Sequence, residues 1–227
     1  MERFTFSQIS SATLRPYVSL KHRPETPDYW LTLSAPLDAR DRERLAVLAP
    51  FLDGLRLAGL NEATLWARAI YPLLMLAEQS SARTWAGVPL RAEFPAFVLE
   101  GTLDGVIGVS DLGDLGRPLL IVAEAKRGLE ASDPQPQLLA EMLAVARCNW
   151  EAVPHGPREI FGCYTISDVW TFARARVGDF DAERPTFEVT LSREHAAWVE
   201  AETVLGILKG IVAHSLAAWA PYLDPAS

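Results

Sequence analysis

The chain has 227 residues, of which 49% are hydrophobic and 22% are charged, a composition that excludes general disorder and allows one domain with a large core. Lys and Arg number 21 against 29 Asp and Glu, and the resulting net charge of −8 excludes a global positive field that would draw the protein onto nucleic acid. Any site for a polyanion must therefore be local.

The cysteines and the apolar runs exclude further classes of protein. Cys148 and Cys163 form no Cys-x-x-Cys pair and have no His at metal-ligand spacing, so they predict two buried reduced thiols. The N-terminus lacks the basic and apolar regions of a secretion signal, and Lys209 and His214 interrupt the apolar run near the C-terminus. We therefore expect a cytoplasmic protein that neither spans nor binds a membrane.

The first part of the chain predicts a helical extension over about residues 1–60. Its first thirty-odd residues contain several prolines and predict irregular chain or a short edge segment, whereas residues 39–59 predict a helix interrupted at Pro50. Residues 61–81 predict a second helix, with Asn61 as its N-cap and a kink at Pro72.

The middle of the chain changes to strand patterns. The predicted elements are a hairpin over residues 88–109, a strand buried on both faces over 119–126, a helix over 131–152, strands over 158–166 and 169–177, and a further strand over 187–192. This order of elements predicts the α/β class, with a central mixed β-sheet flanked by helices.

The last element is a predicted amphipathic helix over about residues 193–220. Its apolar stripe runs from Trp198 to Trp219, and both indoles fit contacts in the core or in a homodimer. We expect a single domain over residues 1–227, with the C-terminal helix as a candidate dimer contact.

Two of the predicted strands end in charged side chains. Side-chain alternation along a strand places Asp104 at the end of one polar face, and places Glu124 and Lys126 together at the end of the next strand. If these strands are neighbours, the two acids converge on a hard divalent cation, and Lys126 lies where it lowers the pKa of an attacking water or neutralises developing charge. The pattern favours hydrolysis of a phosphodiester, although two unrelated solvated strand ends would have the same spacing.

Two further acids need an explanation. Glu78 lies on or beside the apolar stripe of the helix over 61–81, and a buried carboxylate needs a partner or an ion. Glu100 is either an extra ligand on the Asp104 face or a surface partner of Arg91 or Arg117, and we favour the surface pair because such cross-strand pairs are common.

These residues resemble the core of the PD-(D/E)XK nuclease superfamily. The resemblance covers about residues 62–177 and consists of Gly101-x-x-Asp104 on the second strand of a hairpin, Glu124-Ala125-Lys126 at the end of the following strand, a preceding helix with Glu78 and a following helix with Gln137. It implies a restriction-endonuclease-like fold, here with extra N-terminal and C-terminal helices, and cleavage of DNA, less often RNA, with Mg²⁺ or Mn²⁺.

The resemblance also implies roles for individual residues. Asp104, Glu124 and the backbone carbonyl of Ala125 would be metal ligands, and Lys126 would be the water-activating residue. Glu78 would orient a metal-bound water or bind a second ion.

On the following helix the implied roles are less specific. Gln137 would lie near the site, or it would serve helix-start chemistry only, and Gly101 would support the site. Glu141 stands where an exonuclease branch of the superfamily has Tyr in a Gln-x3-Tyr motif, so the chain departs from that branch.

Nucleic acid would need basic side chains near the acids. Arg127 follows the second acidic strand, and Arg174 and Arg176 alternate along a late strand, where they are either substrate contacts or the solvent face of an edge strand. The sequence thus predicts a metal-dependent nuclease acting on DNA. The alternative is the same fold without catalysis, as a nucleic-acid-binding, regulatory or oligomerisation module.

Overall fold

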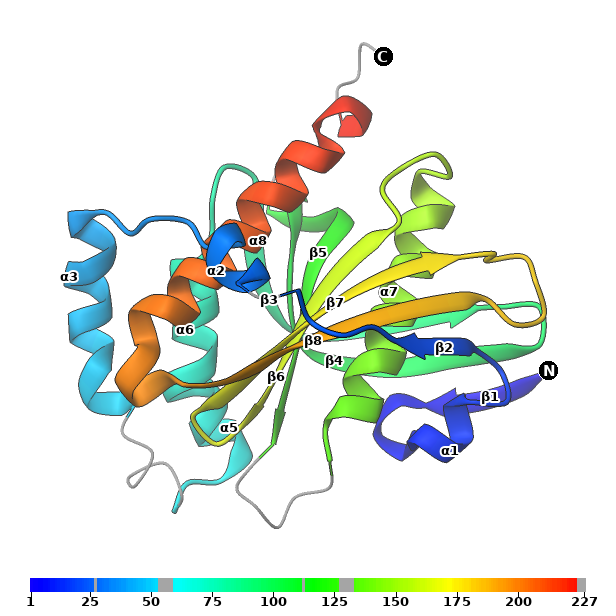
Figure 1. Ribbon diagram of the computed structural model, residues 1–227, viewed down its shortest axis with the longest axis horizontal. Helices are drawn as coiled ribbons and strands as arrows, with labels where there is room; N and C mark the ends of the chain where they lie inside the picture. Colours follow the sequence, from blue (N-terminus) through cyan, green and yellow to red (C-terminus); the bar gives the residue numbers. More distant parts are fainter. Residues whose placement is uncertain (27, 53–58, 112, 127–132, 224–227) are drawn as a thin grey trace.

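A single mixed sheet forms the centre of the protein. The computed structural model describes residues 1–26, 28–52, 59–111, 113–126 and 133–223 (Figure 1). Within these ranges the eight strands are β1 (Glu2–Thr5), β2 (Ser19–His22), β3 (Ala82–Glu93), β4 (Phe97–Asp111), β5 (Asp114–Lys126), β6 (Glu159–Ile166), β7 (Val169–Gly178) and β8 (Thr186–Ala196). Their order in the sheet is β1-β4-β5-β6-β7-β8-β2, with β3 paired to β4.

Hairpins and crossovers alternate in this sheet. β3, β4 and β5 pair antiparallel in sequence, and so do β6, β7 and β8, while β5 and β6 are parallel. A parallel pair needs a crossover, which here contains α7 (Gln135–Ala152). The expected α/β class with a central mixed sheet flanked by helices is therefore confirmed.

The remaining helices lie before β3 or after β8. They are α1 (Ser11–Leu14), α2 (Tyr29–Leu33), α3 (Ala39–Leu48), α5 (Glu62–Leu65), α6 (Tyr71–Leu76) and α8 (Ala197–Leu223). Asn61 caps α5 as expected, because its side chain accepts a hydrogen bond from the Thr64 N–H. A π-helical turn over Trp66–Ile70 joins α5 to α6 just before Pro72.

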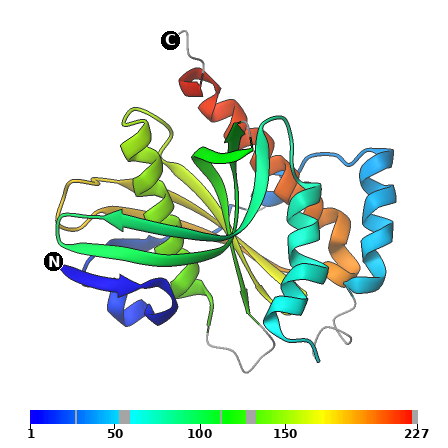
Figure 2. The same ribbon diagram turned by 180° about the vertical axis from the view of Figure 1, so that it is seen from behind.

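Two cores cover the two faces of the sheet. α7 packs on one face, and α8 crosses the other face with α2 and α6 beside it (Figures 1 and 2). β5 contributes to both cores, since Val122 faces α7 and Ile121 faces α8. This strand is buried on both faces, as its continuous apolar run predicts.

The long last helix uses its apolar stripe inside the protein. Leu205, Leu208 and Val212 are completely buried and Trp219 nearly so, whereas Trp198 is 61% exposed. By length and composition α8 could cross a membrane, and 56% of its most apolar stretch is buried within the protein. Trp219 is thus a core residue, and a homodimer through this helix stays a prediction.

The N-terminal segment adds two short strands to the expected helices. β1 pairs parallel with β4, and β2 pairs parallel with β8 at the far edge of the sheet. Strands of four residues carry too little alternation to be recognised in a sequence, and partners far along the chain determine them. β5 begins at Asp114, five residues before the predicted start of this strand at residue 119.

A mostly buried ion pair joins α8 to α3. Lys209 Nζ lies 2.6 Å from Asp41 Oδ2, with the two side chains 16% and 11% exposed. We expect Lys209→Met to lower the free energy of unfolding by about 2 kcal/mol, because it leaves a carboxylate without its cation. Urea denaturation measures this change. The double variant Asp41→Asn with Lys209→Met should recover part of it, and an unchanged stability of Lys209→Met would show that the pair contributes nothing.

Candidate functional site

The middle of β4 and the end of β5 bring together the three residues that the strand patterns single out, because Asp104 lies halfway along β4 and not at its end. Gly105 lies opposite Ala123, which makes Asp104 and Glu124 cross-strand neighbours. Asp104 Oδ2 accepts a hydrogen bond of 3.1 Å from the Ala125 N–H. Lys126 Nζ lies 2.7 Å from Glu124 Oε1.

Glu124 is a charged group in an unusual position. Its side chain is completely buried, and neither carboxylate oxygen accepts a hydrogen bond, so the ion pair with Lys126 is the one interaction that directly balances its charge among the described residues. Burial, and then the charge of Asp104, raise the pKa of Glu124 to about 7. Near neutral pH this group therefore binds a proton readily, and a cation placed beside it would compete with that proton.

Lys126 provides the positive charge of the site. Burial disfavours its ammonium form, but the close contact with the Glu124 carboxylate and its charge outweigh burial and raise the pKa of Lys126, with Glu62 and Asp104 acting in the same direction. Lys126 thus stays protonated at neutral pH. It can neutralise charge or hold an oxygen in place, but it cannot accept a proton as a base in this arrangement.

A third carboxyl group adjoins the first two, on α7. Glu141 is completely buried; its Oε1 accepts a hydrogen bond of 3.0 Å from Gln137 Nε2, and its Oε2 accepts none. Burial, and then the charge of Glu124, raise the pKa of Glu141 well above its usual range. Gln137 therefore contributes by holding Glu141, a residue that the sequence patterns did not single out for the site.

A signal for Glu141 does exist in the sequence. It is an acid inside the otherwise apolar run over residues 138–146, and it follows Gln137 by four positions, the spacing of neighbours on one helix face. A helix that is apolar nearly all round is buried, so a charged residue within it is buried too.

A cavity of about 330 Å³ opens beside the acids. Its lining comes from the start of α5 and the π-helical turn (Glu62, Ala63, Trp66), from β3 (Ala86, Gly87), from β4 (Thr102, Leu103, Asp104) and from β5 (Ala125). Glu62 and Trp66 lie four positions apart, directly after the helix cap, and both reach the cavity. They are two further residues that the sequence patterns did not single out.

Glu78, expected as the helix acid of the site, has a different partner. It follows the end of α6, and its Oε1 accepts a hydrogen bond of 2.9 Å from the Thr84 N–H near the start of β3. Its Oε2 lies 4.0 Å from Arg83 Nε. No contact joins it to Asp104 or Glu124 within the described ranges, so the acid on this side of the site is Glu62.

Two other positions have structural explanations. At Gly101, φ is +154° and an added Cβ would lie 2.7 Å from Phe6 Cδ2, so close packing and backbone conformation require this glycine. Glu100 forms an ion pair with Arg91, its neighbour on β3, with Oε2 and Nε 3.3 Å apart. The surface interpretation of Glu100 is thus confirmed.

Two of the three expected basic contacts lie away from the acids. Arg127 lies outside the described residues. Arg174 stacks over the Tyr29 ring of α2 at 4.6 Å, on the face opposite α7, and Arg176 lies level with the start of β6. Lys126 lies level with the end of β6, so both arginines are separated from the acids by the sheet and along it.

The donor set suits a hard divalent cation. Carboxylate and carbonyl oxygens are the ligands that Mg²⁺ and Mn²⁺ prefer, and the buried oxygens of Glu124 and Glu141 that accept no hydrogen bond are the kind that a cation satisfies. Within the described ranges, no three or more His, Cys, Asp or Glu side chains are arranged to hold a metal ion. The carboxylates of Asp104, Glu124 and Glu141 are therefore neighbours, but their oxygens are not arranged around a single ion position.

No protein-family model matches this chain, and no curated protein matches its sequence.

Proposed function

We propose that the protein is a nuclease that hydrolyses phosphodiester bonds in DNA with Mg²⁺ or Mn²⁺. The observation that carries this proposal is the completely buried Glu124 carboxylate, which accepts no hydrogen bond and lies between Asp104 and the ammonium of Lys126. A buried carboxylate of this kind is costly for folding, and groups with strongly shifted pKa values cluster at functional sites. A catalytic site explains why the chain tolerates the cost.

The order of elements supports the same proposal. α5 and α6 precede the β3–β4 hairpin, β5 carries Glu124 and Lys126 at its end, and α7 leads to the parallel strand β6. This is the order on which the resemblance to the PD-(D/E)XK nucleases rests, and membership of that superfamily is part of the proposal.

The residues divide the chemistry among them. Asp104, Glu124 and the Ala125 carbonyl would hold the ion, which supplies a Lewis acid and a water of lowered pKa when bound. Lys126 keeps its proton and stabilises the negative charge that develops on the phosphate. Trp66 offers an aromatic face in the cavity on which a base can stack.

A binding or regulatory module with the same fold is the second candidate. The pairing of Lys126 with Glu124 favours it, because this ammonium already balances part of the acidic charge without any metal. The net charge of −8 also opposes binding of a polyanion. A module of this kind predicts that the wild-type protein neither binds Mn²⁺ nor cleaves nucleic acid.

A cleavage assay tests the proposal. The purified protein is incubated with single- and double-stranded DNA and RNA in the presence of Mg²⁺ or Mn²⁺, and we expect it to cleave DNA and to stop when EDTA is added. Asp104→Asn should abolish cleavage with an unchanged circular dichroism spectrum, because asparagine can still accept the hydrogen bond from Ala125. If none of the four substrates is cleaved, the proposed activity is wrong.

The two helix acids give a matched pair of variants. Glu62→Gln should lower the cleavage rate about tenfold, since it removes a charge from the cavity that contains Asp104. Glu78→Gln should leave the rate unchanged, because the amide oxygen can still accept the hydrogen bond from Thr84. Single-turnover rates compare the two variants, and the opposite ranking would return the supporting role to Glu78.

A further inference from the structure

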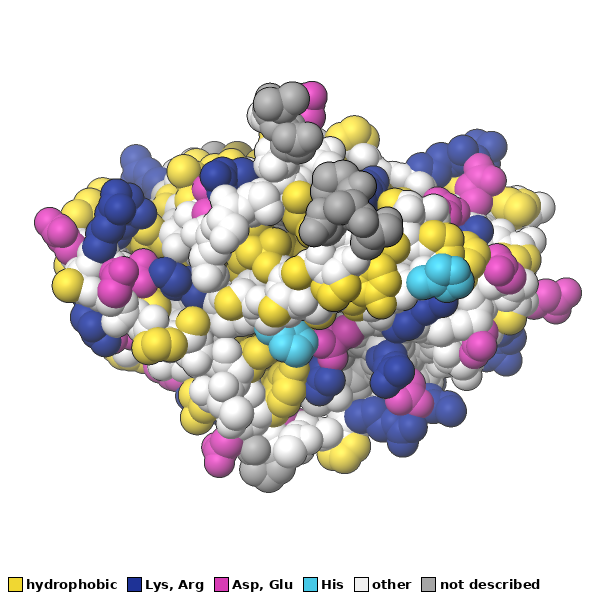
Figure 3. Space-filling model, turned by 90° about the horizontal axis from the view of Figure 1, so that it is seen from above, with side chains coloured by type: hydrophobic (Ala, Val, Ile, Leu, Met, Phe, Trp, Pro, Cys, Tyr) yellow, Lys and Arg dark blue, Asp and Glu magenta, His cyan; other side chains and the backbone are white. Residues whose placement is uncertain are grey.

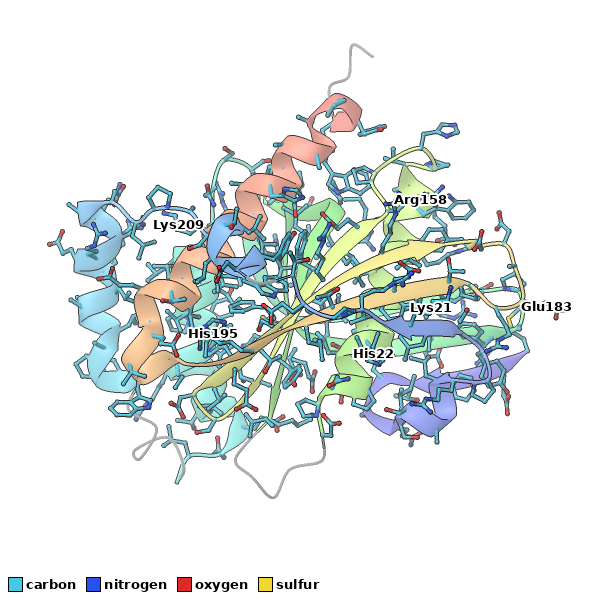
Figure 4. The ribbon with its side chains drawn as sticks, viewed as in Figure 1. Lys21, His22, Arg158, Glu183, His195 and Lys209 are labelled. Carbon is cyan, nitrogen blue, oxygen red and sulfur yellow. The ribbon has the colours of Figure 1, made fainter. Side chains whose placement is uncertain are left out.

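A second cavity lies on the other face of the sheet, at the opposite end from the acids. It has a volume of about 530 Å³ and is lined mainly by charged side chains from the loop before β6 and from β6, β7 and β8, with Arg23 just after β2. Figure 4 shows Arg158 above the strands of this face and Lys21 across it on β2. A cavity of this size is in the range of small-molecule sites.

The two acids of this cavity are already paired. Glu188 Oε1 lies 2.7 Å from Arg23 Nη2. Glu159 pairs with Arg174 through one oxygen and lies 2.8 Å from His214 Nε2 through the other. Each of the two carboxylates thus already has an arginine as its direct partner.

Two arginines of the same cavity have no carboxylate partner. Arg158 donates a hydrogen bond of 3.1 Å to the Pro154 carbonyl, and its guanidinium lies 5.2 Å from the centre of the Phe180 ring. Arg176 forms no hydrogen bond or ion pair with any residue of the described ranges, although it lies between Glu159 and Glu188 in the sheet register. The cavity therefore carries two guanidinium charges that no described carboxylate neutralises directly.

The surroundings strengthen this positive charge. The hydrogen bond from Arg23 holds the pKa of Glu188 below its usual range, and the charges of Lys21 and Arg176 act in the same direction. In Figure 3, Lys and Arg side chains gather at the lower right of the molecule, with a few carboxylates among them. On a protein with a net charge of −8, this is a local concentration of positive charge.

We propose that this cavity binds a phosphomonoester dianion, the terminal phosphate of a nucleotide. A phosphomonoester carries about two negative charges at pH 7, which matches Arg158 and Arg176, and its oxygens match the planar fork of a guanidinium. A single carboxylate would leave one of the two arginines unbalanced. The nucleotide is either free or at the end of a strand, since both present the same phosphate.

The site does not depend on the proposed nuclease activity. Arg174, which lines the cavity, faces α2, whereas Glu124 adjoins Glu141 of α7 on the other face. Variants at the acids should therefore leave phosphate binding unchanged, and the two proposals can fail separately.

Calorimetric titration in EDTA tests the site. We expect the wild-type protein to bind adenosine 5′-monophosphate and not adenosine, and we expect Arg158→Gln and Arg176→Gln each to weaken binding about tenfold, the loss of one charge-assisted contact. Arg40→Gln on α3 makes the same change of charge outside the cavity and should bind as the wild type does. Asp104→Asn should also bind normally, even if the nuclease activity is absent.

Oligonucleotides with and without a 5′-phosphate show whether the cavity binds the phosphate of a free nucleotide or the phosphate at the end of a strand. Preferential binding of the phosphorylated strand, lost in Arg176→Gln, assigns the site to strand ends, whereas equal binding of the two strands together with tight nucleotide binding assigns it to free nucleotides. The proposal is overturned if the nucleotide binds no more tightly than adenosine. It is also overturned if both arginine variants retain the wild-type affinity, or if strands without a terminal phosphate bind and the nucleotide does not.

Discussion

Glu124→Gln should abolish DNA cleavage and should at the same time stabilise the metal-free protein. Glutamine keeps the volume of the side chain but removes the buried carboxyl group, whose pKa is raised to about 7 by burial and by the charge of Asp104. We expect the cleavage rate to fall on the order of a thousandfold, as when a main electrostatic element of a site is lost. The free energy of unfolding at pH 8 in EDTA should rise by about 2 kcal/mol, because one of three adjoining acids becomes neutral.

Glu100→Gln is the matched control for this variant. Glu100 lies on the same strand as Asp104 but is paired with Arg91 at the surface, so both cleavage and stability should stay near their wild-type values. Cleavage rates and thermal unfolding of the three proteins make the comparison. Wild-type cleavage by Glu124→Gln, or a clear loss of its stability, would contradict the role of Glu124 as a strained metal ligand.

The metal-free protein should lose stability relative to Glu124→Gln as the pH rises from about 5 to 8. The pKa of Glu124 is about 7 in the folded protein, above the ordinary value of 4.5. Between these values the folded state keeps a proton that the unfolded state has released, so the contribution of Glu124 to stability is lost as the pH passes through 7. The raised pKa of Glu141 acts in the same direction.

The size of this loss of stability follows from the shift in the pKa of Glu124. A difference of this size in pKa corresponds to about 3 kcal/mol between the ends of the pH range, and the titration of acids that do not adjoin Glu124 cancels in the comparison with Glu124→Gln. Urea denaturation of both proteins at several pH values measures it. Saturating Mn²⁺ should reduce the difference, since the ion binds the charged form. Parallel stability profiles in EDTA would show that Glu124 does not titrate in this range.

Strand alternation is the part of the site that the sequence predicts well. Because side chains alternate along β4 and β5, the positions of Asp104, Glu124 and Lys126 follow once the two strands are known to be neighbours. The sequence leaves open whether the two strands are neighbours, and the antiparallel pairing of β4 with β5 answers this question.

The helix acids are harder to predict because the helix before β3 is irregular. Pro72 has no N–H to donate, and the π-helical turn over Trp66–Ile70 inserts an extra residue into the helical repeat. Periodicity counted through this turn assigns the wrong face to residues beyond it. Glu78 therefore meets the backbone of Thr84, while Glu62, before the turn, reaches the cavity.

Contacts between elements distant in the chain decide the rest. The packing of α7 against the sheet brings Glu141 to Glu124, and no local pattern places one beside the other. The lining of the second cavity is also assembled from distant segments, with Arg23 and Arg176 far apart in the chain. Residues of this kind become recognisable only when the whole sheet is known.

The central claim is that Asp104 of β4 and Glu124 of β5 hold a divalent cation, and calorimetric titration with Mn²⁺ tests it most directly. We expect the wild-type protein to bind Mn²⁺ at pH 7 and to release protons as it does so, because the ion displaces the proton that Glu124 shares in the free protein. Asp104→Asn and Glu124→Gln should each bind at least about tenfold more weakly, and Glu100→Gln should bind as the wild type does. Absence of Mn²⁺ binding by the wild-type protein, or equal affinity in all four proteins, would contradict the claim.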